Sequence, residues 1–137
     1  MTRIQAERKR HKLKFRRLTG QYAIVRLDSR SAVPAWAMQG HFVSISRTED
    51  ELSIVCPVEQ LPADVNSPLR WICLKLEGPF PFSQTGVLLS FIEPVSDSGV
   101  PIFAVATYDT DYVLIPDEFS EKAIDTLERA GHELARG

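Results

Sequence analysis

Short segments rich in apolar and β-favouring residues predict the strands of this chain. Residues 22–28 have such a composition, and apolar and polar residues alternate over part of the segment, so it predicts a first strand. Residues 31–38 are compatible with a short helix, because Pro34 is tolerated in the first turn of a helix. Residues 41–46 and 52–56 flank a polar pentapeptide and predict a hairpin. The first half is therefore expected to run strand, helix, strand, strand.

A loop over residues 57–69, which contains three prolines, precedes a second half with the same order of elements. Residues 71–77 predict a strand, and the apolar positions 87, 88, 91, 92 and 95 share one face of a helix. Pro94 should kink this helix or tighten its last turn, because proline cannot donate to the carbonyl of Ser90. A hairpin over 102–115, an amphipathic helix around 123–130 and a short strand from residue 132 complete the expected order.

The two halves also align residue by residue. Residues 22–28 and 71–77 both begin with an aromatic residue, continue with apolar residues and one base, and end with an acid. Residues 42–57 and 103–116 correspond as well, with a short gap, and both end in proline. Two elements that agree in the same order favour an internal duplication.

Composition is typical of a soluble globular protein. Hydrophobic residues make up 44% and charged residues 25% of the 137 positions. No apolar run approaches the roughly 18 residues that a membrane-spanning helix needs. The N-terminus lacks the apolar core of a secretory signal. We therefore expect a cytoplasmic protein with no membrane association.

Charge is distributed unevenly along the chain. Residues 1–17 hold eight Lys and Arg and one acid, whereas residues 18–137 are strongly acidic. An acidic body is a poor match for phosphate backbones, so no specific nucleic-acid partner is expected. A basic arm of this kind can bind nucleic acid or an anionic membrane surface, but it is more often a solvated segment. We predict that residues 1–17 form a basic, disordered tail, and that residues 1–15 are mobile and dispensable.

The chemistry-bearing residues form no catalytic or metal-binding pattern. Cys56 and Cys73 lie in separate apolar segments, which favours buried thiols over a disulfide or a metal site. The three histidines, His11, His41 and His132, lack metal-ligand spacing. Phosphate-binding, dinucleotide-binding and nucleophile-elbow motifs are also missing. We predict no catalytic residues, no metal and no cofactor, and keep a small enzyme of unrecognised type as an alternative.

The turn Ser83-Gln84-Thr85-Gly86 is the first candidate for ligand binding. It connects the strand over 71–77 to the helix that begins at Val87. A glycine at such a turn lets backbone approach a ligand, and the first N–H groups of a helix are donors for an anion. The alternative is a glycine that serves only helix–strand packing. This order of elements favours a small-molecule sensor over an enzyme.

The hairpin around residues 107–111 is the second candidate. Asp109 and Asp111 would face the same side of an extended chain and repel each other, unless a cation or a ligand ammonium lies between them. Thr107 is a possible hydroxyl donor. The alternative is a polar turn in which aspartate and threonine serve local structure alone.

Residues 71–116 carry a resemblance to a known family. Ser83-Gln-Thr-Gly86-Val-Leu-Leu, followed by a helix and Gly99-Val-Pro-Ile102, resembles the strand–turn–glycine–helix pattern of ACT domains. With Gly78-Pro-Phe and Thr107-Tyr-Asp-Thr-Asp111, the chain is similar to small bacterial two-ACT proteins related to the cytosolic arginine sensors of animals. The resemblance covers residues 18–137.

This resemblance implies an α+β fold of tandem ferredoxin-like ACT modules. A βαββ unit over 18–68 would be fused to a βαββαβ unit over 69–137, with antiparallel sheets and helices on one face. It also implies a non-catalytic regulatory protein that binds an amino acid at the seam between ACT units, and that forms a homodimer. A ligand-free interaction module is the alternative.

The resemblance also assigns residues to the site. The acidic residue that grips the ligand in the arginine sensors corresponds to Gln84, and the hairpin aspartate corresponds to Asp111. A neutral amide cannot pair with a guanidinium as a carboxylate does, which argues against arginine as the ligand. The predicted ligand-binding set is Gln84, Thr85, Gly86, Val87, Thr107, Asp109 and Asp111.

Overall fold

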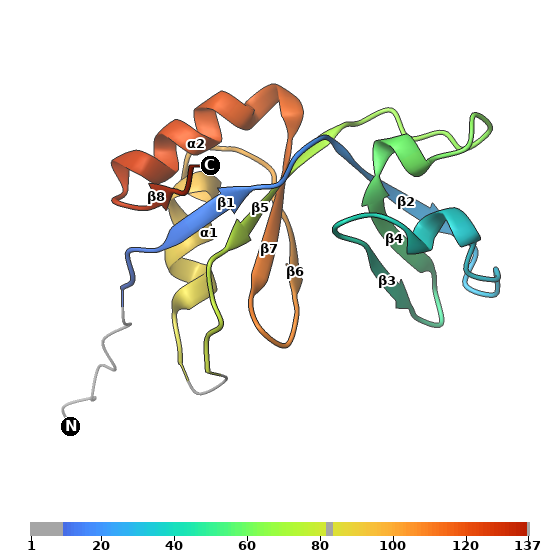
Figure 1. Ribbon diagram of the computed structural model, residues 1–137, viewed down its shortest axis with the longest axis horizontal. Helices are drawn as coiled ribbons and strands as arrows, with labels where there is room; N and C mark the ends of the chain where they lie inside the picture. Colours follow the sequence, from blue (N-terminus) through green and yellow to red (C-terminus); the bar gives the residue numbers. More distant parts are fainter. Residues whose placement is uncertain (1–9, 82–83, 137) are drawn as a thin grey trace.

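The segments predicted as strands pair into one mostly antiparallel sheet. The computed structural model describes residues 10–81 and 84–136, and over these residues it contains an eight-stranded sheet and two α-helices (Figure 1). The strands are β1 (Lys14–Arg17), β2 (Tyr22–Leu27), β3 (Ser44–Arg47), β4 (Leu52–Pro57), β5 (Trp71–Leu76), β6 (Phe103–Ala106), β7 (Asp111–Pro116) and β8 (Glu133–Leu134). The helices are α1 (Val87–Asp97) and α2 (Ser120–Arg129), with 3₁₀ turns η1 (Ala35–Met38), η2 (Val58–Gln60) and η3 (Asp117–Phe119). The predicted α+β class is confirmed.

The sheet has two parts that meet at a single residue pair. Strands β3, β4 and β2 form one part, and β6, β7, β5, β1 and β8 form the other. Tyr22 of β2 pairs with Trp71 of β5, and this is the register recorded between those strands. Farther along the same edge of β5, strand β1 pairs with residues 74–76. The two parts therefore lie side by side, joined through β5 (Figure 1).

The smaller part differs from the prediction between its first two strands. The sequence predicted a helix over residues 31–38, but the structure has only the 3₁₀ turn η1, which follows an extended Pro34. This turn buries a single residue, Ala37. Such a short segment cannot offer the sheet a full apolar face, so an α-helix has little to stabilise it. The expected βαββ unit is therefore a strand, a 3₁₀ turn and a hairpin.

The N-terminal tail prediction is wrong for the residues nearest the body. Residues 14–17 form β1, which lies between β5 and β8, antiparallel to the first and parallel to the second. Phe15 is completely buried and Leu13 is nearly so. Two apolar side chains among basic residues are too weak a pattern to predict a strand, and β1 depends on partners that come from elsewhere in the chain. The remainder of the predicted tail, residues 1–9, lies outside the described residues.

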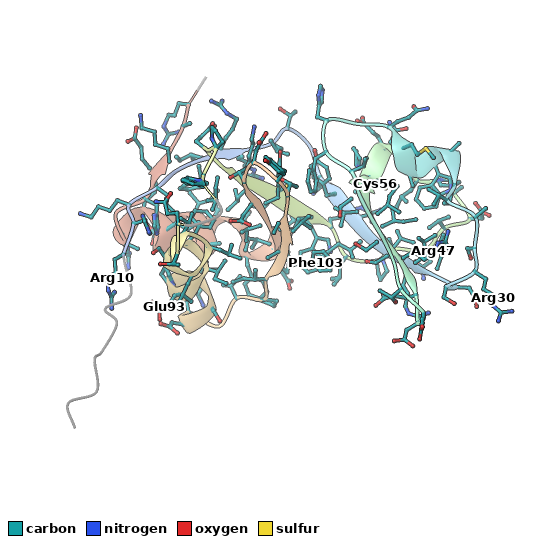
Figure 2. The ribbon with its side chains drawn as sticks, turned by 90° about the horizontal axis from the view of Figure 1, so that it is seen from below. Arg10, Arg30, Arg47, Cys56, Glu93 and Phe103 are labelled. Carbon is teal, nitrogen blue, oxygen red and sulfur yellow. The ribbon has the colours of Figure 1, made fainter. Side chains whose placement is uncertain are left out.

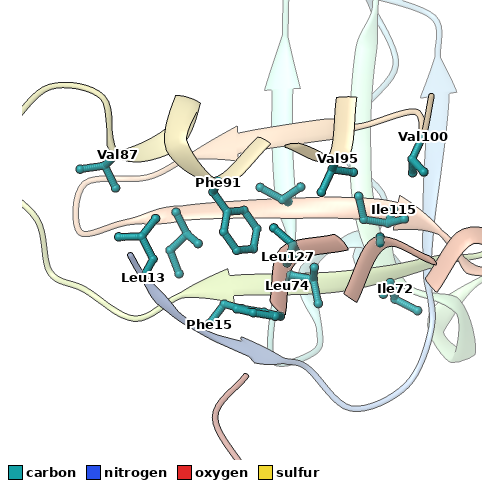
Figure 3. Close-up of a cluster of buried hydrophobic side chains, with 13 residues drawn as sticks. Leu13, Phe15, Ile72, Leu74, Val87, Phe91, Val95, Val100, Ile115 and Leu127 are labelled. Atoms are coloured by element: carbon teal, nitrogen blue, oxygen red, sulfur yellow. The ribbon is translucent and has the colours of Figure 1, made fainter. Parts of the chain in front are cut away.

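The main core lies between the two helices and one face of the larger sheet. Helices α1 and α2 both cover this face (Figure 1). The buried face of α1 consists of Val87, Phe91 and Val95. Phe91 is at the centre of the core, and its ring meets the edge of the Phe15 ring at 5.2 Å between centroids (Figure 3). Strand β1 is thus held by core packing as well as by backbone hydrogen bonds.

The opposite face of the larger sheet packs against the smaller part. Cys73 of β5 and Leu114 of β7 share a cluster with Tyr22, Phe42 and Val55. The rings of Phe42 and Tyr112 stack at 4.2 Å. Phe103 also lies between the two parts (Figure 2). The parts therefore have a shared apolar interface.

A third cluster covers the outer face of β2 and β4. Ala23, Val25, Leu52, Ile54 and Cys56 pack there against η1 and the neighbouring loops. Both cysteines of the chain are free and buried, as the sequence predicted. No helix formed by the described residues is long and apolar enough to cross a membrane.

Candidate ligand-binding site

A groove lies where the start of α1 approaches the hairpin between β6 and β7. Both features are at the same end of the larger sheet, at the bottom of Figure 1. The groove has a volume of about 420 Å³, and we call it the helix–hairpin groove. Six of the seven predicted site residues line it: Gln84, Gly86, Val87, Thr107, Asp109 and Asp111. Thr85 is not part of its lining, and Ser83 lies outside the described residues.

Gly86 forms the entry to α1 in a left-handed backbone conformation. Its φ is +80° and its ψ is 1°, a region that L-residues with a side chain rarely adopt. The helical ladder begins where the Ser90 N–H donates to the Gly86 carbonyl at 2.9 Å. The N–H groups of residues 87–89 therefore precede the ladder and lack helical acceptors. These donors, together with the helix dipole, favour a negative charge in this end of the groove.

The hairpin wall of the groove is held by its two threonines. Thr107 donates to the Thr110 carbonyl through its backbone N–H at 2.8 Å and its hydroxyl at 2.9 Å. The buried Thr110 hydroxyl donates to the Leu76 carbonyl of β5 at 2.8 Å. The Phe80 N–H donates to the Asp109 carbonyl at 3.0 Å, which ties the preceding loop to the hairpin. The Thr107 hydroxyl is thus engaged within the turn, and its role toward a ligand stays a prediction.

Asp111 contributes a carboxylate without a partner to the hairpin wall. Within residues 10–81 and 84–136, no hydrogen bond or ion pair engages this carboxylate. Burial raises the pKa of Asp111 above its ordinary value. A cation or an ammonium group beside it would favour the charged form and reverse that shift. The groove therefore has backbone donors at one side and an unpaired acid at the other.

His11 contacts the turn before α1, although the sequence placed it in the tail. Its Nε2 is 2.9 Å from the Thr85 carbonyl oxygen, and its Nδ1 is 3.4 Å from the Gln84 side-chain nitrogen. Its backbone N–H donates to the Ser90 hydroxyl at 3.1 Å. The sequence offered no signal for these contacts, because they depend on β1, which its own pattern did not predict.

A larger cleft, of about 1350 Å³, contains none of the predicted site residues. It lies where the connection between β1 and β2 meets the end of β4 and the C-terminal segment. Two of its cationic side chains already face acids: Arg16 Nε is 2.8 Å from Glu77, and Arg17 is 3.9 Å from Asp117. The helix–hairpin groove is smaller, but its backbone donors and the Asp111 carboxylate are available to a ligand, so it is the better candidate for a binding site.

The described residues also show no metal-binding arrangement. Among them, no group of three or more His, Cys, Asp or Glu side chains is placed to hold a metal ion.

Comparisons with known proteins divide the chain in the same region as the long loop. The family model described as an ACT domain matches residues 66–129, and a model described as an N-terminal domain matches residues 20–64. Among solved structures, protein Atu0741 from Agobacterium tumefaciens is 47% identical, with a TM-score of 0.85. That likeness covers 91% of this chain and 93% of the Agobacterium protein.

A second solved structure shares the fold at low identity. It is VC0802 from Vibrio cholerae, described as a protein of unknown function and possible transport protein. It is 15% identical with a TM-score of 0.70, over 88% of this chain and 91% of that one. No curated protein matches the chain.

Proposed function

We propose that this chain, whose residues 66–129 match the ACT-domain model, is a regulatory protein whose helix–hairpin groove binds a free amino acid. An ACT domain indicates a regulatory role that depends on a small molecule. The amino acid as ligand, and the absence of catalysis, are our own inferences. They rest on the chemistry of the groove.

The observation that carries the proposal is the opposite polarity of the two groove walls. The start of α1 offers backbone N–H donors, and the facing hairpin offers the unpaired Asp111 carboxylate. A free amino acid carries a carboxylate and an ammonium on adjacent atoms, so it complements both walls at once. We expect its carboxylate near Gly86 and Val87 and its ammonium near Asp111.

The remaining lining suggests how the side chain of the amino acid is held. Phe80, Leu88 and Leu89 contribute apolar surface to the groove, and Gln84 contributes a neutral amide. The resemblance to the arginine sensors implies an acid at the position of Gln84, and a neutral amide there cannot pair with a guanidinium as a carboxylate does. We therefore propose an uncharged amino acid in preference to arginine.

A ligand screen tests the proposed function. We expect at least one of the twenty L-amino acids, tested separately at about 10 mM, to raise the melting temperature by several degrees. A ligand at about 100 times its dissociation constant stabilises a fold by roughly 2.7 kcal/mol, which corresponds to such a shift. Differential scanning fluorimetry measures it.

Two variants make the screen specific to the groove. Asp111→Asn removes the charge that should hold the ammonium, so we expect it to abolish the melting shift. Asp50→Asn is the matched control, because Asp50 is an exposed aspartate at the other hairpin, between β3 and β4. If no amino acid shifts the wild-type protein, the sensor proposal fails and a ligand-free interaction module takes its place.

A further inference from the structure

We propose that His11, which precedes the anchored strand β1, is the residue that positions the Gln84 amide and the turn before α1. The inference rests on the proposed function of the helix–hairpin groove. It extends the site to a part of the chain that neither the sequence pattern nor the family models include, since those matches begin at residue 20.

The first step is that strand β1 fixes the position of this segment. Its backbone bonds join both neighbours: the Glu77 N–H donates to the Lys14 carbonyl at 2.9 Å, and the Glu133 N–H donates to the Leu13 carbonyl at 2.8 Å. Phe15 is fully buried against Phe91 of α1. The residues just before β1 therefore reach α1 from an anchored strand.

The second step is the geometry of the His11 ring. A carbonyl oxygen can only accept, so Nε2 carries the proton that is donated to Thr85 at 2.9 Å. Nδ1 is then the acceptor for the Gln84 amide nitrogen at 3.4 Å. With its nitrogen held by His11, the Gln84 amide has its oxygen left for the groove that it lines. His11 thereby favours a ligand that presents N–H donors at that point.

The third step is a set of contacts that continue this support into α1. The His11 backbone N–H donates to the Ser90 hydroxyl at 3.1 Å, and that hydroxyl donates to the Gly86 carbonyl at 2.6 Å. Residues 10–12 line a pocket along α1 together with Glu93, and Figure 2 shows Arg10 and Glu93 on the same side of the molecule. The anchored segment thus contacts both the turn and the first residues of the helix.

The experiment compares His11 variants with and without amino acid. His11→Ala removes both ring contacts, so we expect faster amide hydrogen exchange over residues 84–90 in the ligand-free protein. The twenty L-amino acids are also titrated separately by calorimetry. For each one that binds the wild type, we expect the dissociation constant of His11→Ala to be about tenfold larger, as the loss of one or two hydrogen bonds would give.

Rescue separates positioning from general stability. His11→Gln places an amide N–H near the position of Nε2, so we expect it to restore slow exchange in the turn and most of the affinity. His41→Ala is the matched control: His41 lies in the larger cleft, away from the groove, and its loss should change neither measurement.

The outcomes distinguish this inference from the proposed function. If an amino acid binds the wild type and His11→Ala binds it equally well, the inference is overturned and the proposed function stands. If no amino acid binds, the proposed function fails, and the exchange data still decide: unchanged exchange in His11→Ala overturns the positioning role, whereas faster exchange reversed by His11→Gln retains it.

Discussion

The side chain of His132 connects helix α1 to the segment before β1. Pro94 has no N–H to donate to the Ser90 carbonyl, so His132 supplies the hydrogen bond through Nε2 at 2.9 Å. The other ring nitrogen, Nδ1, accepts from the Leu13 N–H at 3.1 Å. A ring that donates at one nitrogen and accepts at the other is neutral, and His132 is nearly fully buried.

We predict that stability decreases in mild acid because of His132. Burial lowers its pKa below the ordinary 6.5, although the bond to Ser90 opposes this shift. The unfolded chain therefore binds a proton more readily, so the stabilisation is complete above pH 6.5 and is lost as the pH falls below it. Urea unfolding at a series of pH values measures the effect. His132→Gln should flatten this part of the profile, and an equally steep profile in that variant would contradict the assignment.

We predict that Gly86→Ala costs both stability and ligand binding. Gly86 has a φ of +80°, and a side chain in the left-handed region costs about 1–2 kcal/mol. Relief of this strain would move the backbone donors at the start of α1. Urea unfolding and fluorimetry with amino acids measure the two effects.

Gly99→Ala is the matched control for that prediction. Gly99 has a φ of +85° beyond the other end of α1, and its Cβ would meet no atom within 4 Å. We expect a similar loss of stability with the melting shift by amino acid retained. If Gly99→Ala also abolished the shift, general destabilisation would explain both variants.

At the scale of elements, strand β1 is the addition that most changes the fold. It occupies the place between β5 and β8, so the last strand of the ACT-like part pairs with β1 instead of β5. In the ferredoxin-like order implied by the resemblance, all the strands of this unit come from residues 69–137. Here the N-terminal segment contributes one of them.

We predict that Phe15→Ala destabilises the protein by about 3–5 kcal/mol. The side chain is completely buried and contacts Phe91, and truncation of a buried phenylalanine leaves a cavity of that cost. Urea unfolding measures the loss. Lys14→Ala, at an exposed position of the same strand, should change stability little. A wild-type midpoint for Phe15→Ala would restore the view that this segment is a dispensable tail.

At the scale of the whole molecule, the two parts are held mainly by side chains. One residue pair joins their strands, whereas the cluster around Tyr22, Phe42, Val55, Cys73 and Leu114 is apolar and buried. The parts therefore depend on this interface for their relative position. Strands β3, β6 and β8 are the edges of the sheet, each paired on one side only among the described strands.

We predict a homodimer in solution, as part of the proposed function. Unpaired strand edges favour pairing, and symmetric dimers are the commonest assemblies. A second copy would also place another ACT-like unit at the seam where we expect the ligand. Light scattering at tens of micromolar, a range where weak dimers form, measures the mass. A single species of 15.4 kDa would contradict this prediction.

Much of both parts could be predicted from sequence because the signals of these elements are local. Residues 22–27 and 71–76 are strands, as their composition indicated, and Val87, Phe91 and Val95 form the buried face of a helix at the predicted spacing. The turn glycine, Gly86, has a φ of +80°, a conformation that glycine adopts readily. The roles of Gln84, Asp111 and their neighbours in ligand binding stay predictions.

The sequence by itself therefore determined the elements whose signal, a periodic apolar pattern or a turn motif, is contained in a few neighbouring residues. Only the tertiary structure decided the rest. Leu13 and Phe15 are too few to signal a strand, and β1 forms because β5 and β8, distant in the chain, supply its hydrogen bonds and its core. The contact of His11 with Gln84 follows from that strand and spans 73 positions. Such contacts leave no periodic trace in the sequence, because their energy comes from partners that only folding brings together.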